Sequence, residues 1–248
     1  MENDEGVEKL FFELASESRL SILRELRKEN LKMHEIARRL DVTATEAFRQ
    51  LQRLSEALLV QKQPEGTFAI TQYGTLVLQL SSSLDFVFKH KNYFSTHDAW
   101  RLPHQFVNRI GELSQASLIM DTIEGINRGE RMFIEAEHYA WAMAEGRVPE
   151  LMGPIMNEKI RKGLNGRMLF LESFLLPDAI PPAKLPNLEN RTLPDIPAII
   201  ALTEKEAAIC FHLVGGRTDY AGFFGSDPLF LNWVKDLFLY YWDKGKPT

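Results

Sequence analysis

The order of elements between residues 31 and 71 constrains the fold of this chain more than any other feature. Residues 33–40 and 44–58 each have the apolar spacing of an amphipathic helix, and only a three-residue turn separates them. Residues 59–71 then alternate around a proline and a glycine, as the two strands of a β-hairpin do. Helix, turn, helix and hairpin in this order predict a winged helix-turn-helix, whose second helix would enter a DNA major groove.

The second of these helices has one apolar face and one polar face. Steps of four, three and four residues separate the side chains predicted to be buried: Ala47, Leu51, Leu54 and Leu58. The outward side chains predicted to contact DNA bases are Thr45, Arg49, Gln50 and Arg53. Arginine can make two hydrogen bonds to guanine, and glutamine two to adenine, in the major groove. Phe48 borders the apolar face, where we expect it to join the core; contact with a thymine methyl group is the alternative.

Basic side chains around the two helices are predicted to bind phosphates, which position a protein on DNA without specifying a sequence. They are Arg38 and Arg39 on the first helix and Lys62 at the hairpin. From residue 32 to residue 62 there are six Lys and Arg against four Asp and Glu, so this segment is locally positive in a chain of net charge −5. Each arginine taken alone could equally be an ordinary solvated side chain.

Capping residues are predicted for two helices of this region. Thr43 is expected to cap the second helix of the motif and to lie near DNA, with Glu46 completing a capping box. Two more helices are predicted before the motif, the first from about Val7 and the second capped by Ser18. The leucines of the latter recur at steps of three and predict a buried face, whereas Arg19 is expected to face water.

Residues 72–94 are predicted to form one long connecting helix, because they lack proline and contain glycine only near their start. Alternating steps of four and three residues define a seam along it: Tyr73, Val77, Leu80, Leu84, Val87, Lys91 and Phe94. Such a seam predicts either a coiled coil between two copies of the chain or a helix that packs on its own domain. A dimer would arrange two reading helices about a twofold axis and would imply a palindromic site.

The remaining residues predict an α/β domain, because helical segments alternate with short apolar strands. Strands are expected at 137–144, 166–171, 198–202, 207–213 and 220–224, and helices around 123–136, 148–162 and 228–243. His138 and His212 lie in these strands and are predicted to be core residues. Residues 177–197 are rich in proline and are predicted to be irregular. The expected domains are the winged helix-turn-helix at 1–71, the connector at 72–97 and the α/β domain at 98–248.

Composition indicates a soluble protein that works inside the cell. No apolar run reaches the roughly 18 residues of a membrane span, and the acidic start of the chain is unlike a signal peptide. The single cysteine, Cys210, fits a reducing cytoplasm, and one Cys with six scattered His provides no cluster of zinc ligands. We therefore expect a cytoplasmic protein without a metal or another cofactor.

The N-terminal segment resembles the winged helix-turn-helix regulators of the ArsR and TrmB type. The similar residues are Ile36-Ala37, Val42-Thr43, Arg49, Leu51, Leu54 and Leu59-Val60. Those families usually have glycine at the position of Leu58 and a small or polar residue at that of Phe48. Metal sensing, which some ArsR regulators perform, is not implied, because the sequence has no matching set of Cys and His ligands.

The rest of the chain resembles archaeal regulators that carry the methanogenesis-regulator middle domain. The similar positions are Phe86, the run 91–98, Leu102-Pro103, Trp141-Ala142-Met143, Gly163 and Gly166-Arg167. In that family a winged helix precedes a phospholipase-D-like α/β sensor region. Phospholipase D chemistry needs His and Lys two residues apart, and no such pair occurs in this sequence. The resemblance therefore implies a sensor domain that is not an enzyme.

Open α/β sheets bind ligands beyond the carboxyl ends of their strands. The residues expected there are Trp141, Met143, Glu145, Glu172, Ser173, Arg217, Asp219 and Tyr220. Ordinary structural roles are open to several of them: Trp141 as core, the glutamates as solvated side chains, and Arg217 with Asp219 as parts of a turn. The sequence thus predicts a dimeric transcription regulator that binds double-stranded DNA and a small-molecule effector. The alternatives are a protein–protein adaptor built on a winged helix and an enzyme with an appended winged helix.

Overall fold

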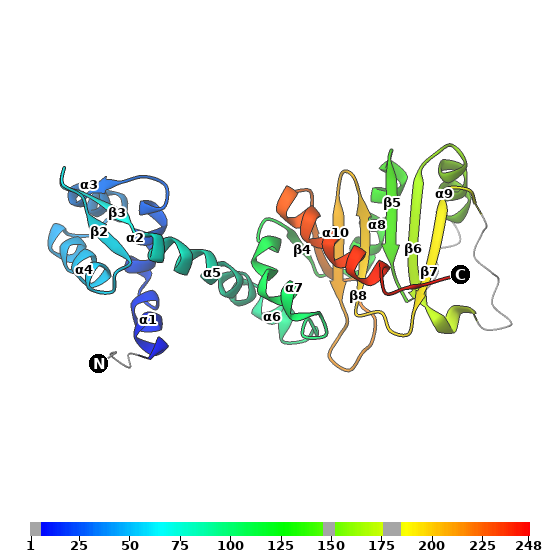
Figure 1. Ribbon diagram of the computed structural model, residues 1–248, viewed down its shortest axis with the longest axis horizontal. Coiled ribbons are helices and arrows are strands. Elements are labelled where there is room, and N and C mark those ends of the chain that lie inside the picture. Colours follow the sequence, from blue (N-terminus) through cyan, green and yellow to red (C-terminus); the bar gives the residue numbers. More distant parts are fainter. Residues whose placement is uncertain (1–5, 146–151, 176–184) are drawn as a thin grey trace. The chain divides into compact units, whose positions relative to one another are not determined.

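The computed structural model describes residues 6–145, 152–175 and 185–248, in which the chain forms two compact units (Figure 1). The first unit, here called the head, ends at Ser82, and the second begins at Ser83. Helices and strands occur in both units, so the predicted α/β class with several domains is confirmed. The likeness of the second unit to phospholipase D stays a prediction.

The head combines short helices with a small antiparallel sheet. Its elements are α1 (Val7–Leu14), α2 (Glu17–Leu26), β1 (Leu31–Lys32), α3 (Met33–Arg39), α4 (Ala44–Glu56), β2 (Val60–Lys62) and β3 (Thr67–Ile70). The strands pair in the order β1-β3-β2, with β2 and β3 as the two arms of the hairpin. The short turn between α3 and α4 and the hairpin that follows confirm the predicted winged helix-turn-helix.

Apolar side chains from the helices and the hairpin form the core of the head. Its buried members include Ile22, Leu23, Leu26, Ile36, Leu51, Leu54, Leu59 and Val60. Ala47 is buried as well, so three of the four positions predicted for the buried face of α4 are confirmed. The cap predicted for α2 is wrong by two residues, because the hydroxyl of Ser16 and not that of Ser18 caps the helix, by accepting the N–H of Arg19 in its first turn.

Leu58 is the exception among the predicted core positions of the second helix. α4 ends at Glu56, and Leu58 follows with a φ of 59° and a side chain that is 70% exposed. The N–H of Leu58 donates to Ser55 O (3.0 Å) and the N–H of Leu59 to Leu54 O (2.9 Å), which are the two bonds of a Schellman motif. The motif needs a residue in the left-handed region, where glycine is the residue without strain. Leu58 therefore lies beyond the end of the helix and does not belong to its buried face.

α5 (Gln72–Lys89) and α6 (Lys91–Phe94) form the predicted connecting helix, with a one-residue break between them. The hydroxyl of Thr71 accepts the N–H of Gly74 (2.8 Å) and so caps α5. A side chain at Gly74 would collide with the carbonyl oxygen of Leu59. Glycine at this position therefore allows α5 to begin directly beside the end of α4.

The second unit is built on a mixed sheet, which has eight strands in the described residues. The strands are β4 (Ser117–Ile119), β5 (Tyr139–Met143), β6 (Asn165–Leu171), β7 (Leu188–Leu193), β8 (Ala198–Thr203), β9 (Ala207–Phe211), β10 (Gly222–Gly225) and β11 (Lys246–Pro247). The helices are α7 (His104–Asn108), α8 (Thr122–Glu135), α9 (Met152–Arg161) and α10 (Pro228–Trp242), with 3-10 turns η1 (Ile110–Leu113) and η2 (Glu172–Leu175). The strand order is β11-β7-β6-β5-β8-β9-β10-β4, in which β5, β6 and β7 are parallel.

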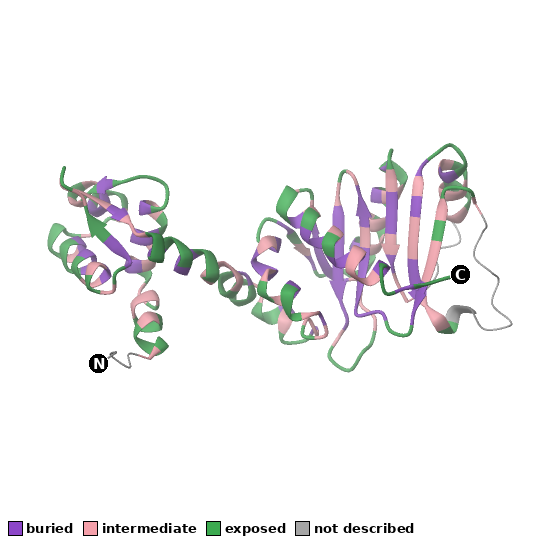
Figure 2. Cartoon of the chain, viewed as in Figure 1, coloured by how far each residue is buried: buried purple, intermediate pink, exposed green. Residues whose placement is uncertain are grey.

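Helices cover both faces of this sheet. The ring of Trp141 in β5 stacks on that of Phe238 in α10, with centroids 5.3 Å apart, whereas the preceding Ala140 packs with Ile160 of α9. Successive residues of a strand point to opposite faces, so α10 lies on one face, and α9 with α8 on the other (Figure 1). Between the two helical layers, every residue of β9 is buried and nearly every residue of β8 (Figure 2).

Two predictions for the second unit are wrong. Leu188–Leu193, expected to be irregular, forms β7 beside β6, because pairing with a buried neighbour stabilises a strand whose own sequence is polar and flanked by prolines. His138 is exposed, since it lies just before β5, whereas His212 is buried as predicted. Residues 177–184 of the predicted irregular segment and residues 148–151 of the predicted helix at 148–162 lie outside the described residues. None of the described helices is long and apolar enough to cross a membrane.

Candidate functional site

One side of α4 carries side chains that do not enter the core of the head. Thr45, Phe48, Arg49 and Gln52 form this side, at the steps of three and four residues that place helix positions next to one another. All four residues are exposed, and we call this surface the α4 face. Thr43 caps the helix as predicted, because its hydroxyl accepts the N–H of Glu46 (3.1 Å).

Phe48 belongs to the α4 face, and the expectation that it joins the core is wrong. Its side chain is 57% exposed. The buried residues of α4 are at positions 47, 50, 51 and 54, the pattern of a single helical stripe. Phe48 follows Ala47 by one residue, which turns it about 100° away from that position and out of the stripe.

The prediction that Gln50 reads DNA bases is wrong, because its side chain points into the head. Gln50 is only 7% exposed, and its Oε1 accepts a hydrogen bond from Nη1 of Arg19 (3.1 Å). The signal was available in the sequence: position 50 completes the steps of three, one and three residues that begin at Ala47. A polar residue at a buried position of this kind indicates a buried polar partner.

Arg19 is that partner, and the expectation that it faces water is wrong. It is 6% exposed, and its Nε and Nη2 donate to the carbonyl oxygens of Glu13 (2.8 Å) and Phe12 (2.7 Å) at the end of α1. Its Nε also lies 2.8 Å from the carboxylate of Glu13. Burial lowers the pKa of the Arg19 guanidinium, and the negative charge of Glu13 opposes this shift. Arg19 therefore ties α1, α2 and α4 together.

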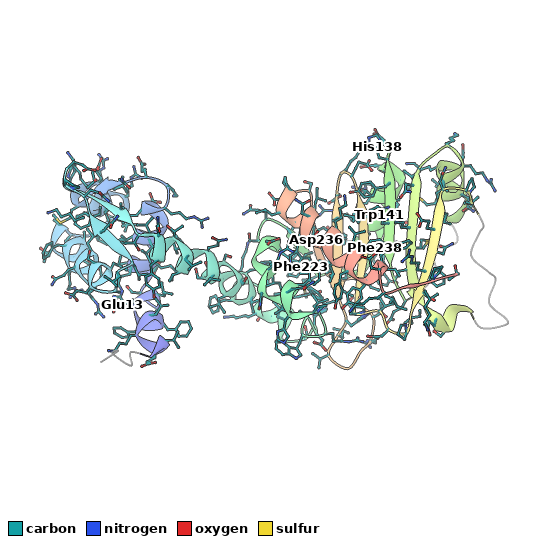
Figure 3. The ribbon with its side chains drawn as sticks, viewed as in Figure 1. Glu13, His138, Trp141, Phe223, Asp236 and Phe238 are labelled. Atoms are coloured by element: carbon teal, nitrogen blue, oxygen red, sulfur yellow. The ribbon has the colours of Figure 1, made fainter. Side chains whose placement is uncertain are left out.

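Arg53 lies against α1, so its predicted role at DNA bases is not supported by its geometry. Its Nη2 is 2.6 Å from Oε1 of Glu13, and its guanidinium lies 5.0 Å from the ring centroid of Phe12 (Figure 3 labels Glu13). The hydrogen bond to Glu13 raises the pKa of Arg53. The charge that could attract DNA is thus already balanced by a carboxylate of the same head.

The residues predicted to bind phosphates divide into paired and unpaired groups. Arg39 makes ion pairs with Glu25 (3.0 Å) and Glu29 (2.7 Å), and these hydrogen bonds raise its pKa. Arg38 on α3 and Lys62 at the end of β2 are exposed, and neither charged group makes a hydrogen bond or an ion pair with another described residue. The same holds for Arg49 on the α4 face. Among the cationic residues predicted to contact DNA, these three have charged groups that remain available to a DNA strand.

α5 exposes a stripe of apolar side chains that differs from the predicted seam. Steps of three, four, four and three residues connect its members, the α5 stripe: Tyr73, Leu76, Leu80, Leu84 and Val87. Val77 belongs instead to the core of the head, and Phe94 packs against the core of the second unit. Lys91 is exposed, with its ammonium group 4.8 Å from the ring centroid of Phe88. Some apolar residues of the connector thus pack within their own unit, as expected for a helix that packs on its own domain. Others are exposed, as expected for a coiled coil between two copies.

Trp141 and Met143, predicted to line a ligand site in the second unit, are core residues. Trp141 stacks on Phe238 of α10, and its indole Nε1 donates to Oδ1 of Asn165 (2.8 Å) (Figure 3). The guanidinium of Arg167 lies 4.7 Å from the ring centroid of Trp141. Met143 is completely buried. Their predicted role as part of a binding surface is therefore wrong, because the helix layer covers this face of the sheet.

Polar groups do meet where β5 and β9 end, at what we call the carboxyl edge of the sheet. The hydroxyl of Thr218 donates to Glu145, and Nε2 of the buried His212 lies 3.7 Å from the same carboxylate. Asp219 accepts hydrogen bonds from the hydroxyl of Thr122 (2.9 Å) and from Nε2 of His97 (3.2 Å). Burial raises the pKa of Asp219, but these bonds, together with the backbone N–H of Ala221, lower it overall.

The other residues predicted to bind a ligand differ from one another in their contacts and exposure. Glu172 forms an ion pair with Lys246 (2.8 Å), so it is held by the C-terminal strand β11. Ser173 and Arg217 are exposed. Tyr220 is half-buried, and burial raises the pKa of its hydroxyl. No group of three or more His, Cys, Asp and Glu side chains in the described residues could hold a metal ion.

Comparison with known proteins finds a family model that matches the N-terminal part of the chain and a solved structure of low sequence identity. A family model described as the HVO_A0261 N-terminal domain matches residues 7–87, which comprise the described head and most of α5. A solved structure of TrmBL2, described as an archaeal chromatin protein with a novel mode of DNA binding, is 14% identical, with a TM-score of 0.45 and 94% of each chain covered. No curated protein matches the chain. The resemblance to ArsR regulators and to the methanogenesis-regulator domain stays a prediction.

Proposed function

We propose that the chain is a transcription regulator that reads double-stranded DNA with the α4 face. One observation carries the proposal. Arg49 stands on the exposed side of the second helix of a winged helix-turn-helix, and its guanidinium makes no hydrogen bond or ion pair with another described residue. A guanidinium in this position can donate two hydrogen bonds to guanine in the major groove. Thr45 lies nearer the start of α4, where helices of this kind commonly meet base edges.

Phosphates would be bound by Arg38 of α3 and Lys62 of the hairpin, on either side of α4 in the sequence. Arg39 and Arg53 contribute less in this proposal, because glutamates of the head already hold both groups. Phosphate contacts fix the position and orientation of a protein on the duplex, whereas base contacts specify the sequence. Arg49 is therefore the residue whose loss should change sequence preference.

Selection of bound sequences from random duplex DNA, with the full chain as bait, tests the proposal. We expect a consensus sequence, and we expect Arg49→Ala to weaken binding to that consensus by about 1–3 kcal/mol. Arg131→Ala is the matched control, because it removes an exposed arginine from α8 of the second unit. Equal affinity of wild type and Arg49→Ala for the selected duplex would contradict the assignment.

Salt separates this proposal from a protein–protein adaptor. DNA binding that releases counterions weakens steeply as the salt concentration rises, in proportion to the phosphates neutralised. An adaptor that docks a protein on the head should retain no oligonucleotide, even at low ionic strength. We also propose that the protein acts in the cytoplasm, where it meets its DNA.

We further propose that the regulator is a dimer joined through the α5 stripe. Five apolar side chains at helical spacing face outward along α5, and a second copy of the same stripe would bury them. Such a pair has twofold symmetry, so two heads would read a palindromic site.

The second unit is proposed to bind a small-molecule effector at the carboxyl edge and not to act as an enzyme. Glu145, Thr218 and Asp219 support this placement, because they gather polar groups at the edge where open α/β sheets bind ligands. Control of DNA binding then requires that the effector bind the DNA-competent and DNA-incompetent states with different affinity. Retention of a metabolite from a cell extract by wild type and not by Thr218→Val would identify the ligand.

A further inference from the structure

Phe48 puts a large apolar ring in the middle of the otherwise polar α4 face. Thr45 and Gln52 flank it at steps of three and four residues, and Arg49 follows it directly. The ring makes no aromatic or cation–π contact with another described residue. Phe12 provides the contrast, because its equally exposed ring lies beneath the guanidinium groups of Arg19 and Arg53. Phe12 thus contributes to the contacts between α1 and the arginines of the head, whereas Phe48 makes no such contact with another described residue.

We propose that Phe48 recognises thymine through its C5 methyl group in the major groove. This inference rests on the proposed function, in which the α4 face meets DNA. Among the base edges of the major groove, the thymine methyl is the apolar group, and phenylalanine is one of the side chains that contact it. Phe48 therefore favours thymine by contact with its methyl group, which guanine, cytosine and adenine lack.

The position of Phe48 beside Arg49 also limits where this thymine lies. Neighbouring helix residues are about 1.5 Å apart along the axis and point about 100° apart, so their side chains reach adjacent or nearly adjacent base pairs. Arg49 is the residue proposed to bind guanine. The selected sequence should consequently contain a thymine within about two base pairs of that guanine in each half-site.

Replacement of thymine by uracil tests the inference, because uracil lacks only the C5 methyl group. Each thymine of the selected duplex is replaced in turn, and the affinity of the full chain is measured by fluorescence anisotropy. We expect one position per half-site at which wild type loses about fourfold in affinity, the ratio that corresponds to one methyl-sized apolar contact. Phe48→Ala should show a similar loss on the thymine duplex and no further loss on the uracil duplex.

Phe48→Leu and Phe11→Ala complete the set of variants. Leucine keeps an apolar side chain, so it should retain part of the discrimination between thymine and uracil, whereas Phe11→Ala changes an exposed phenylalanine of α1 and should discriminate like wild type. Equal affinity of wild type for every uracil duplex would overturn the inference, as would losses from Phe48→Ala and uracil that simply multiply. A changed oligomeric mass of Phe48→Ala without DNA would assign the ring to a protein contact instead.

The proposed function can fail separately from this inference. Absence of binding to any duplex by wild type, even at low salt, would remove both. A selected consensus that depends on Arg49 but is insensitive to the thymine methyl would leave the proposed function in place and exclude the role of Phe48 alone.

Discussion

At the scale of residues, Arg19 decides which side chains of α4 remain free. Its guanidinium donates a hydrogen bond to the buried side chain of Gln50. Glu13, which also contacts Arg19, forms an ion pair that holds Arg53 against α1. Two of the four side chains predicted to contact bases are thereby used inside the head. Arg49 and Thr45 remain, and both are exposed. A buried guanidinium with several acceptors is costly to disrupt, because the loss of one acceptor leaves a buried N–H group without a hydrogen-bond partner.

Leu58 gives the first residue-scale prediction. A leucine at a φ of 59° is strained, and the left-handed region costs a non-glycine residue about 1 kcal/mol. Leu58→Gly should therefore stabilise the end of α4 by about 1 kcal/mol, despite the loss of an exposed side chain. Hydrogen exchange of the α4 amides, read by mass spectrometry, should show slower exchange in the variant.

Leu58→Ala is the control for this prediction. It removes most of the same side chain but keeps a Cβ at the strained position, so its α4 amides should exchange no more slowly than those of wild type. Equal protection in both variants would mean that side-chain removal, and not backbone strain, causes the effect.

Asp219 gives a second prediction, on pH. Its pKa is lower in the folded chain than its ordinary value of 3.8, so the folded state binds fewer protons than the unfolded state and gains stability above that value. The gain is lost as the pH falls through the lowered pKa of the folded state. Asp219→Asn should cost about 1 kcal/mol in the free energy of unfolding at neutral pH and less as the pH falls below about 4.

Urea unfolding followed by circular dichroism measures this difference at each pH. Thr122→Val is the companion variant, because it removes one hydrogen bond to Asp219 and keeps the carboxylate. It should show a smaller loss at neutral pH. A cost of Asp219→Asn that is the same at every pH would show that shape, not charge, matters at this position.

At the scale of elements, the sequence predicts those helices, strands and turns whose formation depends on the local pattern of residues. The turn between α3 and α4, the hairpin and the alternation of strands in the second unit follow from apolar spacing and turn residues. β7 is missed because its stability comes from pairing with β6 rather than from its own residues. The α4 face is predicted only in part, because the placement of some side chains of α4 also depends on contacts with distant elements. Thr45 and Arg49 follow from helix phase, whereas the environments of Gln50 and Arg53 depend on α1 and α2, which lie far away in the sequence.

The α5 stripe gives the prediction at this scale. Leu80→Glu places a charge in the middle of the stripe, where a second copy would otherwise cover it, so it should convert a dimer into a monomer. Sedimentation equilibrium should show half the mass. Thr75→Glu makes the same charge change at an exposed position of α5 outside the stripe, and it should leave the mass unchanged. A monomeric wild type would refute the proposed dimer.

At the scale of the whole molecule, charge argues for two heads. The chain carries a net charge of −5, so attraction to DNA must come from a local surface. Each head offers Arg38, Arg49 and Lys62, whose charged groups make no ion pair or hydrogen bond with another described residue. A few cations support only weak binding, whereas two linked heads act at the same duplex with a high effective concentration. Dimerisation and DNA affinity are therefore expected to fall together in the Leu80→Glu variant.

The boundary at Ser82 and Ser83 has a practical consequence. All four tryptophans of the chain, at positions 100, 141, 233 and 242, belong to the second unit. Intrinsic fluorescence excited at the indole band is thus an emission signal from that unit alone, and the head contributes none. A metabolite titration of the second unit can therefore be followed by this emission in the presence of an oligonucleotide, without an attached dye.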